Sequence, residues 1–316
     1  MEKERLENQE IDLVYLWCDA GDELWAKKKA CTMQKLQKSF DKDASDDCRF
    51  IQSDELKYSL RSVEKYAPWI NKIFIVTDNQ KPAWLDINNP KIKIVDHKEI
   101  LPADALPCFN STAIETGLPY IKDLSECFLF ANDDTFFWDY VDKSDFFTGD
   151  LKPVCRLRQR IKNKKYKHLY GYIVKKAYDM IKHRYGINMP YFPHHNIDAY
   201  RKSYFLDCMA EFREEFEKTA HQQFREFDSV QRSIVTYYMA ANNLCEVKHV
   251  AKPWYNPFFK SDSRYVKCLA KPLAELKTAN CKLLCVNDCN RTTNKDRELM
   301  KKLLEEKFPE KSGFEI

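Results

Sequence analysis

Three apolar runs of the chain each end in polar residues, and this pattern is the strongest constraint on its fold. The runs lie at 11–17, 72–76 and 128–131, and the residues at 54–66 carry apolar side chains at helical spacing. A strand, helix, strand order is typical of a parallel sheet covered by helices. The sequence therefore predicts an α/β fold with a doubly wound, mostly parallel sheet, to which residues 92–97 add another strand.

Carboxylates follow these strands at the edge where ligands bind in such sheets. Asp19 and Asp22 follow the first strand, Asp78 follows the second, and the triplet Asn132-Asp133-Asp134 follows the run that ends at residue 131. Two adjacent carboxylates repel each other unless they share a cation or a proton, and hard divalent cations prefer oxygen ligands. The triplet taken alone is more typical of a turn, but its position also predicts a site for Mg²⁺ or Mn²⁺.

The second half of the chain, 151–316, has mainly helical patterns and we expect it to complete one catalytic unit with an α/β half at 1–150. Two prolines stiffen the loop before His194 and His195, which makes it a suitable platform for a general base. Arg225 and Asp228 precede a predicted helix, and a late apolar strand ends in Asn287-Asp288, as the central strand ends in Asn-Asp.

The segment 156–167 is strongly basic and interleaved with tyrosine. It fits either a solvated helix face or a patch for an anionic acceptor or anionic lipid head groups.

Composition excludes several classes of function. Lys and Arg number 52 against 48 Asp and Glu, which is too balanced to indicate nucleic-acid binding. With 6 glycines and no glycine-rich phosphate loop, side chains and metal would have to bind any phosphate. No run reaches the roughly 18 apolar residues that cross a bilayer, so a membrane contact would be peripheral. The 12 scattered cysteines, with no apolar run near the start, predict free thiols in a cytoplasmic protein.

Four blocks of residues, in order, carry a family resemblance. They are 11–22, the region 54–147 with Tyr58-Ser59-Leu60-Arg61-Ser62 and Asn132-Asp133-Asp134, then Pro193-His194 with Phe224-Arg225, and finally Leu284 to Asp288. Together they resemble the Stealth family of sugar-1-phosphate transferases, which build phosphodiester-linked surface polysaccharides in bacteria. The chain departs from the family pattern at Cys18, at Ala20-Gly21, and in a spacing from Arg225 to Asp228 that is one residue short.

This resemblance implies a fold like that of nucleotide-sugar transferases and a reaction that forms a phosphodiester. The donor would be a nucleotide-diphospho-sugar, with a uridine diphosphate sugar favoured, and the acceptor a glycan hydroxyl. A nucleoside monophosphate would leave. The enzyme would be cytoplasmic, or peripheral at the inner face of the plasma membrane.

The resemblance also implies roles for individual residues. Asp133, Asp134 and Asp288 would hold the divalent cation, Arg61 and Arg225 would neutralise phosphate oxygens, and His194 would be the general base, with an aspartate as the substitute. Contacts to nucleotide or sugar would come from Asp19, Asp22, Asp78, Asn110, Glu115, Asn132 and Asp228. For Asn110 and Glu115, helix capping is an equally good interpretation.

Two other functions remain open from the residues alone. A metal-dependent glycosyltransferase would use the same acidic strand ends but release a nucleoside diphosphate. A non-catalytic glycan-binding or capsule-assembly scaffold would tolerate the loss of these acids, all of which are present.

Overall fold

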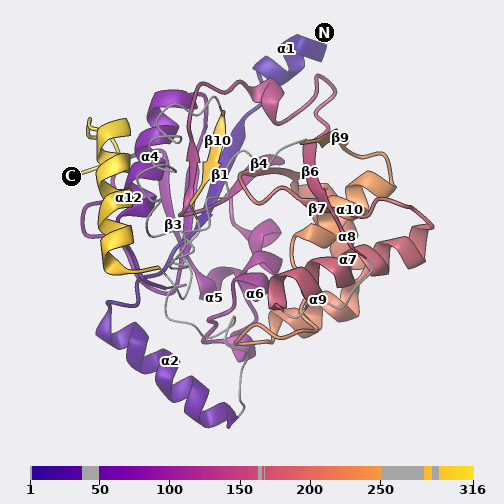
Figure 1. The fold of residues 1–316 in the computed structure, drawn as a ribbon, viewed down its shortest axis with the longest axis horizontal. Coiled ribbons are helices and arrows are strands. Elements are labelled where there is room, and N and C mark those ends of the chain that lie inside the picture. The colour runs from indigo at the N-terminus through magenta and orange to yellow at the C-terminus, as the bar shows by residue number, and fades with distance from the viewer. Residues whose placement is uncertain (1, 38–49, 163–165, 167, 251–280, 287–291) are drawn as a thin grey trace.

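The structure of the protein is a computed structural model. It describes residues 2–37, 50–162, 166, 168–250, 281–286 and 292–316, and the statements below concern these residues (Figure 1).

A five-stranded sheet with strand order β3-β2-β1-β4-β8 lies at the centre of the molecule. Four strands are parallel and β8 pairs antiparallel with β4: β1 (Ile11–Leu16), β2 (Ile73–Thr77), β3 (Ile92–Asp96), β4 (Cys127–Asn132) and β8 (Asp198–Arg201). The predicted doubly wound, mostly parallel sheet is therefore confirmed. Its fifth strand comes from the second half of the chain, so both halves build one sheet.

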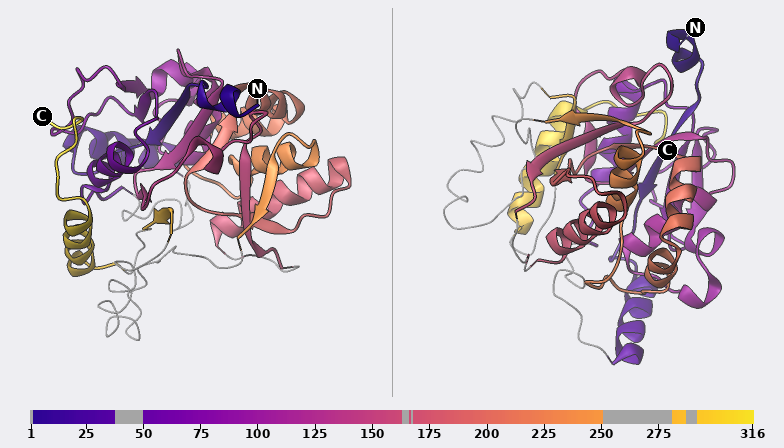
Figure 2. Two further views of the ribbon diagram at one scale, coloured as in Figure 1. Left: turned by 90° about the horizontal axis from the view of Figure 1, so that it is seen from above. Right: turned by 90° about the vertical axis from the view of Figure 1, so that its right-hand side faces the viewer.

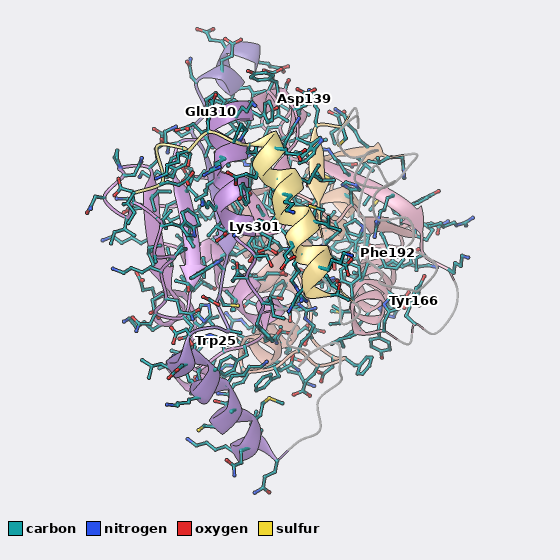
Figure 3. The ribbon with its side chains drawn as sticks, turned by 60° about the vertical axis from the view of Figure 1, so that its left-hand side comes forward. Trp25, Asp139, Tyr166, Phe192, Lys301 and Glu310 are labelled. Atoms are coloured by element: carbon teal, nitrogen blue, oxygen red, sulfur yellow. The ribbon has the colours of Figure 1, made fainter. Side chains whose placement is uncertain are left out.

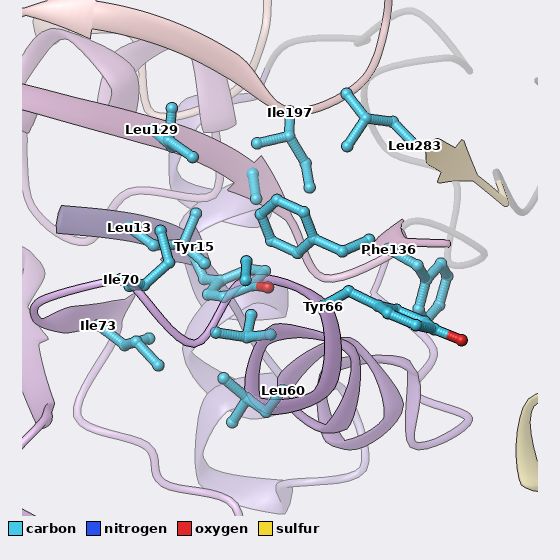
Figure 4. Close-up of a cluster of buried hydrophobic side chains, with 14 of the residues drawn as sticks. Leu13, Tyr15, Leu60, Tyr66, Ile70, Ile73, Leu129, Phe136, Ile197 and Leu283 are labelled. Atoms are coloured by element: carbon cyan, nitrogen blue, oxygen red, sulfur yellow. The ribbon is translucent and has the colours of Figure 1, made fainter. Parts of the chain in front are cut away.

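Both faces of the central strands are buried, which explains why they read as continuous apolar runs. On one face Leu13, Tyr15 and Leu129 pack with Leu60, as Figure 4 shows. On the other face Val14, Phe128 and Phe130 belong to a second apolar cluster.

Helices cover both faces of the sheet. Figures 1 and 2 show α12 beside α4 on one side and the helices α7 to α10 on the other. The helices are α1 (Glu2–Glu7), α2 (Glu23–Leu36), α4 (Glu55–Tyr66), α5 (His97–Ile100), α6 (Ser111–Thr116), α7 (Leu169–Tyr185), α8 (Lys202–Glu211), α9 (Arg213–Ala220), α10 (Ser233–Ala241) and α12 (Asn294–Lys307). Among the described helices, none has the length and apolar composition required to cross a bilayer.

Two small sheets complete the fold. In one, β5 (Thr135–Phe137) pairs antiparallel with β10 (Leu283–Cys285). In the other, β6 (Val154–Arg160) lies between β7 (Tyr191–Pro193) and β9 (Glu246–His249). The start of the basic segment is therefore a strand, and the interpretation of residues 156–160 as a helix face is wrong. No disulfide joins the nine cysteines of the described part, as expected.

Arg61 fastens the C-terminal end of the chain to α4. Its guanidinium donates to both carboxylate oxygens of Glu315 (2.8 and 2.9 Å) and to the Phe308 carbonyl (2.7 Å). The side chains of Arg61 and Glu315 are only 5% and 2% exposed. The structure thus gives Arg61 a buried carboxylate partner in place of the expected phosphate, and we assign it to support of the fold.

We expect the Arg61–Glu315 pair to show strong coupling in a double-mutant cycle. Either single change, Arg61→Met or Glu315→Met, leaves one buried charge without its partner and should destabilise the protein by about 3 kcal/mol or more. The double variant should lose clearly less than the sum of the two losses, because no charge remains buried. Urea unfolding of the four proteins measures this, and additive losses would contradict a buried ion pair.

Candidate active site

Two carboxylates stand immediately after β4. Asp133 accepts a hydrogen bond from Gln52 Nε2 at 2.9 Å, and the Cys285 thiol donates to Asp134 Oδ1 at 3.8 Å. Burial raises the pKa of Asp133. Burial, and then the charges of Asp133 and Glu55, raise the pKa of Asp134 well above its ordinary value. A bound divalent cation would stabilise both carboxylates in their charged form. The carboxylate oxygens of this turn are therefore suitable ligands for Mg²⁺ or Mn²⁺.

The third expected metal ligand, Asp288, lies outside the described residues. The nearest described residue before it is Val286, whose amide donates to the Asp134 carbonyl at 2.8 Å. Within the part of the chain that the structure describes, no three His, Cys, Asp or Glu side chains form a metal-binding group.

Hydrogen bonds from β1 and α4 fix this turn. The Tyr15 hydroxyl and Ser59 Oγ are 2.6 Å apart, and Ser59 Oγ donates to the Thr135 carbonyl at 2.6 Å. Gln52 also donates to the Cys18 carbonyl (2.7 Å), so it links the loop after β1 to Asp133. The two carboxylates are therefore held in place by their neighbours on three segments.

Gln80 ties together the loops that follow β1 and β2. Its amide group bonds both the backbone N–H (3.0 Å) and the carbonyl (2.8 Å) of Asp19, and it donates to Asp22 Oδ2 at 3.2 Å. Asp22 also caps α2 through the amides of Leu24 and Trp25, and these bonds contribute to lowering its pKa. Asp19 and Asp22 thus lie at the expected edge, with Asp22 committed to a helix cap.

Asp78 lies at the same edge, after β2, and forms an ion pair with Lys28 of α2 (2.8 Å). His97, the first residue of α5, is close to it and only 4% exposed, and its Nδ1 has no partner in the described part. Burial lowers the pKa of the His97 imidazole from its ordinary 6.5 to about 4, against the opposing charges of Asp78 and Asp96.

A cationic group of side chains lies beside the acidic turn. Because β8 runs antiparallel to β4, with Asp198 opposite Phe130, the residues that lead into β8 lie alongside the end of β4. These residues include His194 and His195. Burial and then the guanidiniums of Arg232 and Arg158 hold the pKa of His195 well below its ordinary value.

Part of this cationic group has unmet hydrogen-bonding capacity. The buried atoms His194 Nδ1 and Arg158 Nε have no partner among the described residues. Burial, Arg158 and Arg156 lower the pKa of His194 to about 4, so its imidazole is neutral and in the base form. Buried polar atoms normally have a partner, and buried cationic surroundings favour an anion. The cluster therefore fits an anionic group such as a phosphate.

Glu115 supports this cluster instead of facing a substrate. One of its oxygens accepts from Arg232 Nη1 and the other from the Arg232 backbone N–H, both at 3.0 Å. Arg232 also donates to Asp198 at 3.3 Å and lies 4.5 Å from the centre of the Phe130 ring. Burial raises the pKa of Asp198 to about 6, although Arg232 opposes the rise. The expected sugar or nucleotide contact of Glu115 is thus replaced by a buried ion-pair network.

Three other expected residues also make contacts within the protein. Asn110 caps α6 by accepting from the Thr112 amide (3.1 Å), as the capping interpretation proposed, and donates to the Gln222 carbonyl (2.9 Å). Arg225 donates to the Ser111 hydroxyl at the start of α6 and lies close to His195. Asp228 accepts from Gln222 (2.6 Å) and from Lys218, so it organises its own loop. Asn132 is the last residue of β4 and is half-buried.

Sequence reasoning missed an aromatic cluster that holds these loops together. Trp25 of α2 (Figure 3) lies 5.2 Å from both Phe50 and Phe109, measured between ring centroids, and Phe109 stacks on Phe224 at 5.3 Å. The cluster joins the loop after β1 to the chain beside Arg225. Arg232 was missed too, because no local motif distinguishes it from exposed arginines, whereas Arg158 lies in the segment 156–167 that was predicted as a possible patch for an anionic acceptor.

Comparison with known proteins gives a consistent family. Residues 49–154 match the family model described as Stealth protein CR2, conserved region 2. The exopolysaccharide phosphotransferase cps2G of Lactiplantibacillus plantarum is 31% identical over 97% of this chain and 96% of its own length. The capsular polysaccharide phosphotransferase WcwK of Streptococcus pneumoniae is 30% identical over 97% of this chain and 98% of its own length. The corresponding enzyme fcs1 of Haemophilus influenzae is 33% identical over 90% of this chain and 79% of its length.

Solved structures are similar only at a low level. An active-site mutant of LgtC has a TM-score of 0.41 at 12% identity, and covers 94% of this chain and 96% of its own. The inositol-1-phosphate CTP transferase from T. maritima has a TM-score of 0.38 at 13% identity, with 94% and 98% covered. Likeness at this level carries no conclusion about substrate or chemistry.

His97 should make the protein less stable as the pH falls. Between pH 6.5 and about 4, the unfolded chain binds a proton that the folded protein excludes, so stability present above pH 6.5 is lost at about 1.4 kcal/mol per pH unit. Between pH 7 and pH 5, wild type should lose about 2 kcal/mol more than His97→Gln in urea unfolding. His183→Gln, at an exposed position of α7, is the matched control. Equal losses in wild type and His97→Gln would contradict a buried neutral imidazole.

Proposed function

Because this chain belongs to the Stealth family of polysaccharide phosphotransferases, we propose that it transfers a sugar-1-phosphate from a nucleotide-diphospho-sugar to a glycan hydroxyl. The glycan would be a growing surface or capsular polysaccharide, and the new linkage a phosphodiester. The names of the relatives, capsular and exopolysaccharide phosphotransferases, support both the transferred group and the class of acceptor.

The observation that carries this proposal is the meeting of two opposite charge clusters at the carboxyl edge of the sheet. Asp133 and Asp134 directly follow β4, and the segment with His194 and His195 precedes β8, the neighbouring strand of the sheet. Phosphoryl transfer needs little covalent chemistry from a protein. It depends on holding donor and acceptor in line and on neutralising charge on the phosphate oxygens. An acidic and a cationic cluster side by side can serve both needs.

In the proposed reaction, the acceptor hydroxyl oxygen forms a bond to the phosphorus attached to the sugar. The bond from that phosphorus to the bridging oxygen of the diphosphate breaks, and the nucleoside monophosphate leaves with the electron pair. The neutral imidazole of His194 would take the hydroxyl proton. Arg225, held by Ser111, would neutralise nonbridging phosphate oxygens.

Asp133 and Asp134 would hold Mg²⁺ or Mn²⁺, with Asp288 as a third ligand proposed from the sequence alone. When bound, such a cation supplies positive charge against the diphosphate. Asp19, Asp22, Asp78 and Asn132, at the ends of β1, β2 and β4, would line the nucleotide and sugar side, where we favour a uridine diphosphate sugar.

The identity of the released nucleotide tests the reaction. Purified protein, Mg²⁺ and an oligosaccharide acceptor with a panel of nucleotide sugars should release a monophosphate in step with a new phosphodiester. Asp134→Asn should lower turnover by about a hundredfold or more, because a neutral amide holds a divalent cation poorly. Since the Asp134 carboxylate is costly in the folded state, the variant should melt no lower than wild type.

Asp139→Asn makes the same chemical change at an exposed position, labelled in Figure 3, and should leave turnover unchanged. Release of a nucleoside diphosphate would make the protein a glycosyltransferase. Near-normal turnover of Asp134→Asn would remove the metal assignment.

Substituting each of the two adjacent histidines tests which of them is the general base. His194→Gln should lower kcat by about a hundredfold or more with a smaller effect on the acceptor KM, because a general base accelerates proton transfer in the transition state. His195→Gln is the matched variant one residue away and should retain more activity. The opposite order of the two losses would transfer the role to His195.

A further inference from the structure

Two cysteines lie beside each other where β6 and β9 begin. Val154 of β6 is opposite Glu246 of β9, with Cys155 directly after the first of these residues and Cys245 directly before the second. Cys155 is only 5% exposed and belongs to the second apolar cluster. Cys245 is half-buried and packs against the same cluster. The two thiols therefore lie on the same side of the pair of strands.

The Cys245 thiol is close enough to affect the Cys155 thiol. The neighbouring thiol, and then burial, raise the pKa of Cys155 well above its ordinary value. Both cysteines are free in the structure. The residue directly opposite Cys155 is Val247, so Cys245 is its diagonal neighbour. A bond between the two sulfurs therefore requires the backbone of one or both segments to move.

Both segments that carry these thiols are fastened to the proposed active site. On the β6 side, the Arg156 carbonyl accepts from the His194 amide at 2.8 Å. On the β9 side, the Leu244 amide donates to the Met239 carbonyl of α10 at 2.8 Å, and α10 begins directly after Arg232. A movement that brings the sulfurs together is thus shared by the strand that holds His194 and the helix that follows Arg232.

We propose that Cys155 and Cys245 form a reversible disulfide when peroxide is present, and that this bond lowers turnover by displacing His194. The effect on turnover rests on the proposed function, whereas formation of the bond does not. Half-buried Cys245 meets the oxidant first, because buried Cys155 is less accessible to it.

Hydrogen peroxide supplies the oxidising power for this step. The Cys245 sulfur attacks one peroxide oxygen, the O–O bond breaks, and the released hydroxide and the thiol proton form water, which leaves Cys245 as a sulfenic acid. The Cys155 sulfur then attacks the Cys245 sulfur, the S–O bond breaks, and a second water leaves with the Cys155 proton. The two thiols lose two electrons, and one peroxide becomes two waters. A dithiol such as dithiothreitol returns the electrons.

Peptide mapping and turnover of the full chain test this inference together. After peroxide treatment, mass spectrometry of the alkylated and digested protein should find peptides linked through Cys155 and Cys245. Monophosphate release should fall about tenfold, the order of loss expected when a catalytic group shifts by about half an ångström. Dithiothreitol should restore it. Cys245→Ser should form no link and should keep its turnover under peroxide.

Cys31→Ser is the matched control, because Cys31 is an exposed cysteine of α2, and this variant should lose turnover under peroxide as wild type does. Hydrogen–deuterium exchange gives a second readout that needs no substrate. Oxidation should raise the exchange of the amides at 192–196 in wild type, because the bond from the His194 amide to β6 is disturbed, but not in Cys245→Ser.

Absence of the linked peptides, or equal inhibition of wild type and Cys245→Ser by peroxide, would overturn the inference. A linked pair with unchanged exchange and unchanged turnover would overturn it as well. If no nucleotide sugar supports turnover but the link and the change in exchange both appear, the proposed function is wrong and the disulfide that displaces His194 stands.

Discussion

The repulsion between Asp133 and Asp134 is the interaction on which the rest of the site depends. Two carboxylates in a partly buried turn are unfavourable as charged groups, and the raised pKa values of both express this cost. Hydrogen bonds from Gln52, and from the Tyr15 and Ser59 hydroxyls behind the turn, help to hold them there. A turn that holds two adjacent carboxylates in place fits a divalent cation.

The antiparallel direction of β8 is what brings the two histidines to the same place. A parallel strand in that position would bring its carboxyl end to this edge, whereas β8 brings the chain that precedes it, with His194 and His195. The two clusters can remain separate because each has internal partners. Arg232 is paired with Glu115 and Asp198, and Lys28 with Asp78, whereas the Arg158 guanidinium and the neutral His194 each keep a buried nitrogen without a partner in the described part. Charge is thereby kept available for a ligand.

The sequence was informative where structure is local. Apolar runs predicted the central strands, and polar residues at their ends predicted the edge of the sheet at which the candidate site lies. The failures are long-range. Arg61 has the pattern of a site residue, yet its partner Glu315 lies 254 positions away. Glu115 pairs with Arg232, which lies 117 positions further along the chain. The alternating Arg-Leu-Arg-Gln-Arg at 156–160 has strand periodicity, but its high charge suggested a solvated helix. No local sequence pattern predicts which carboxylate an arginine will pair with in the folded protein.

The position of Arg61 also connects the C-terminal segment to the active edge. By holding Glu315 and the Phe308 carbonyl, Arg61 fastens the end of α12 against α4. The strand before α12, β10, pairs with β5, and the Val286 amide beyond β10 donates to the Asp134 carbonyl. The same helix α4 supplies Ser59, which bonds the Thr135 carbonyl from the other side. A residue that does not touch the acidic turn can thus govern how firmly that turn is held.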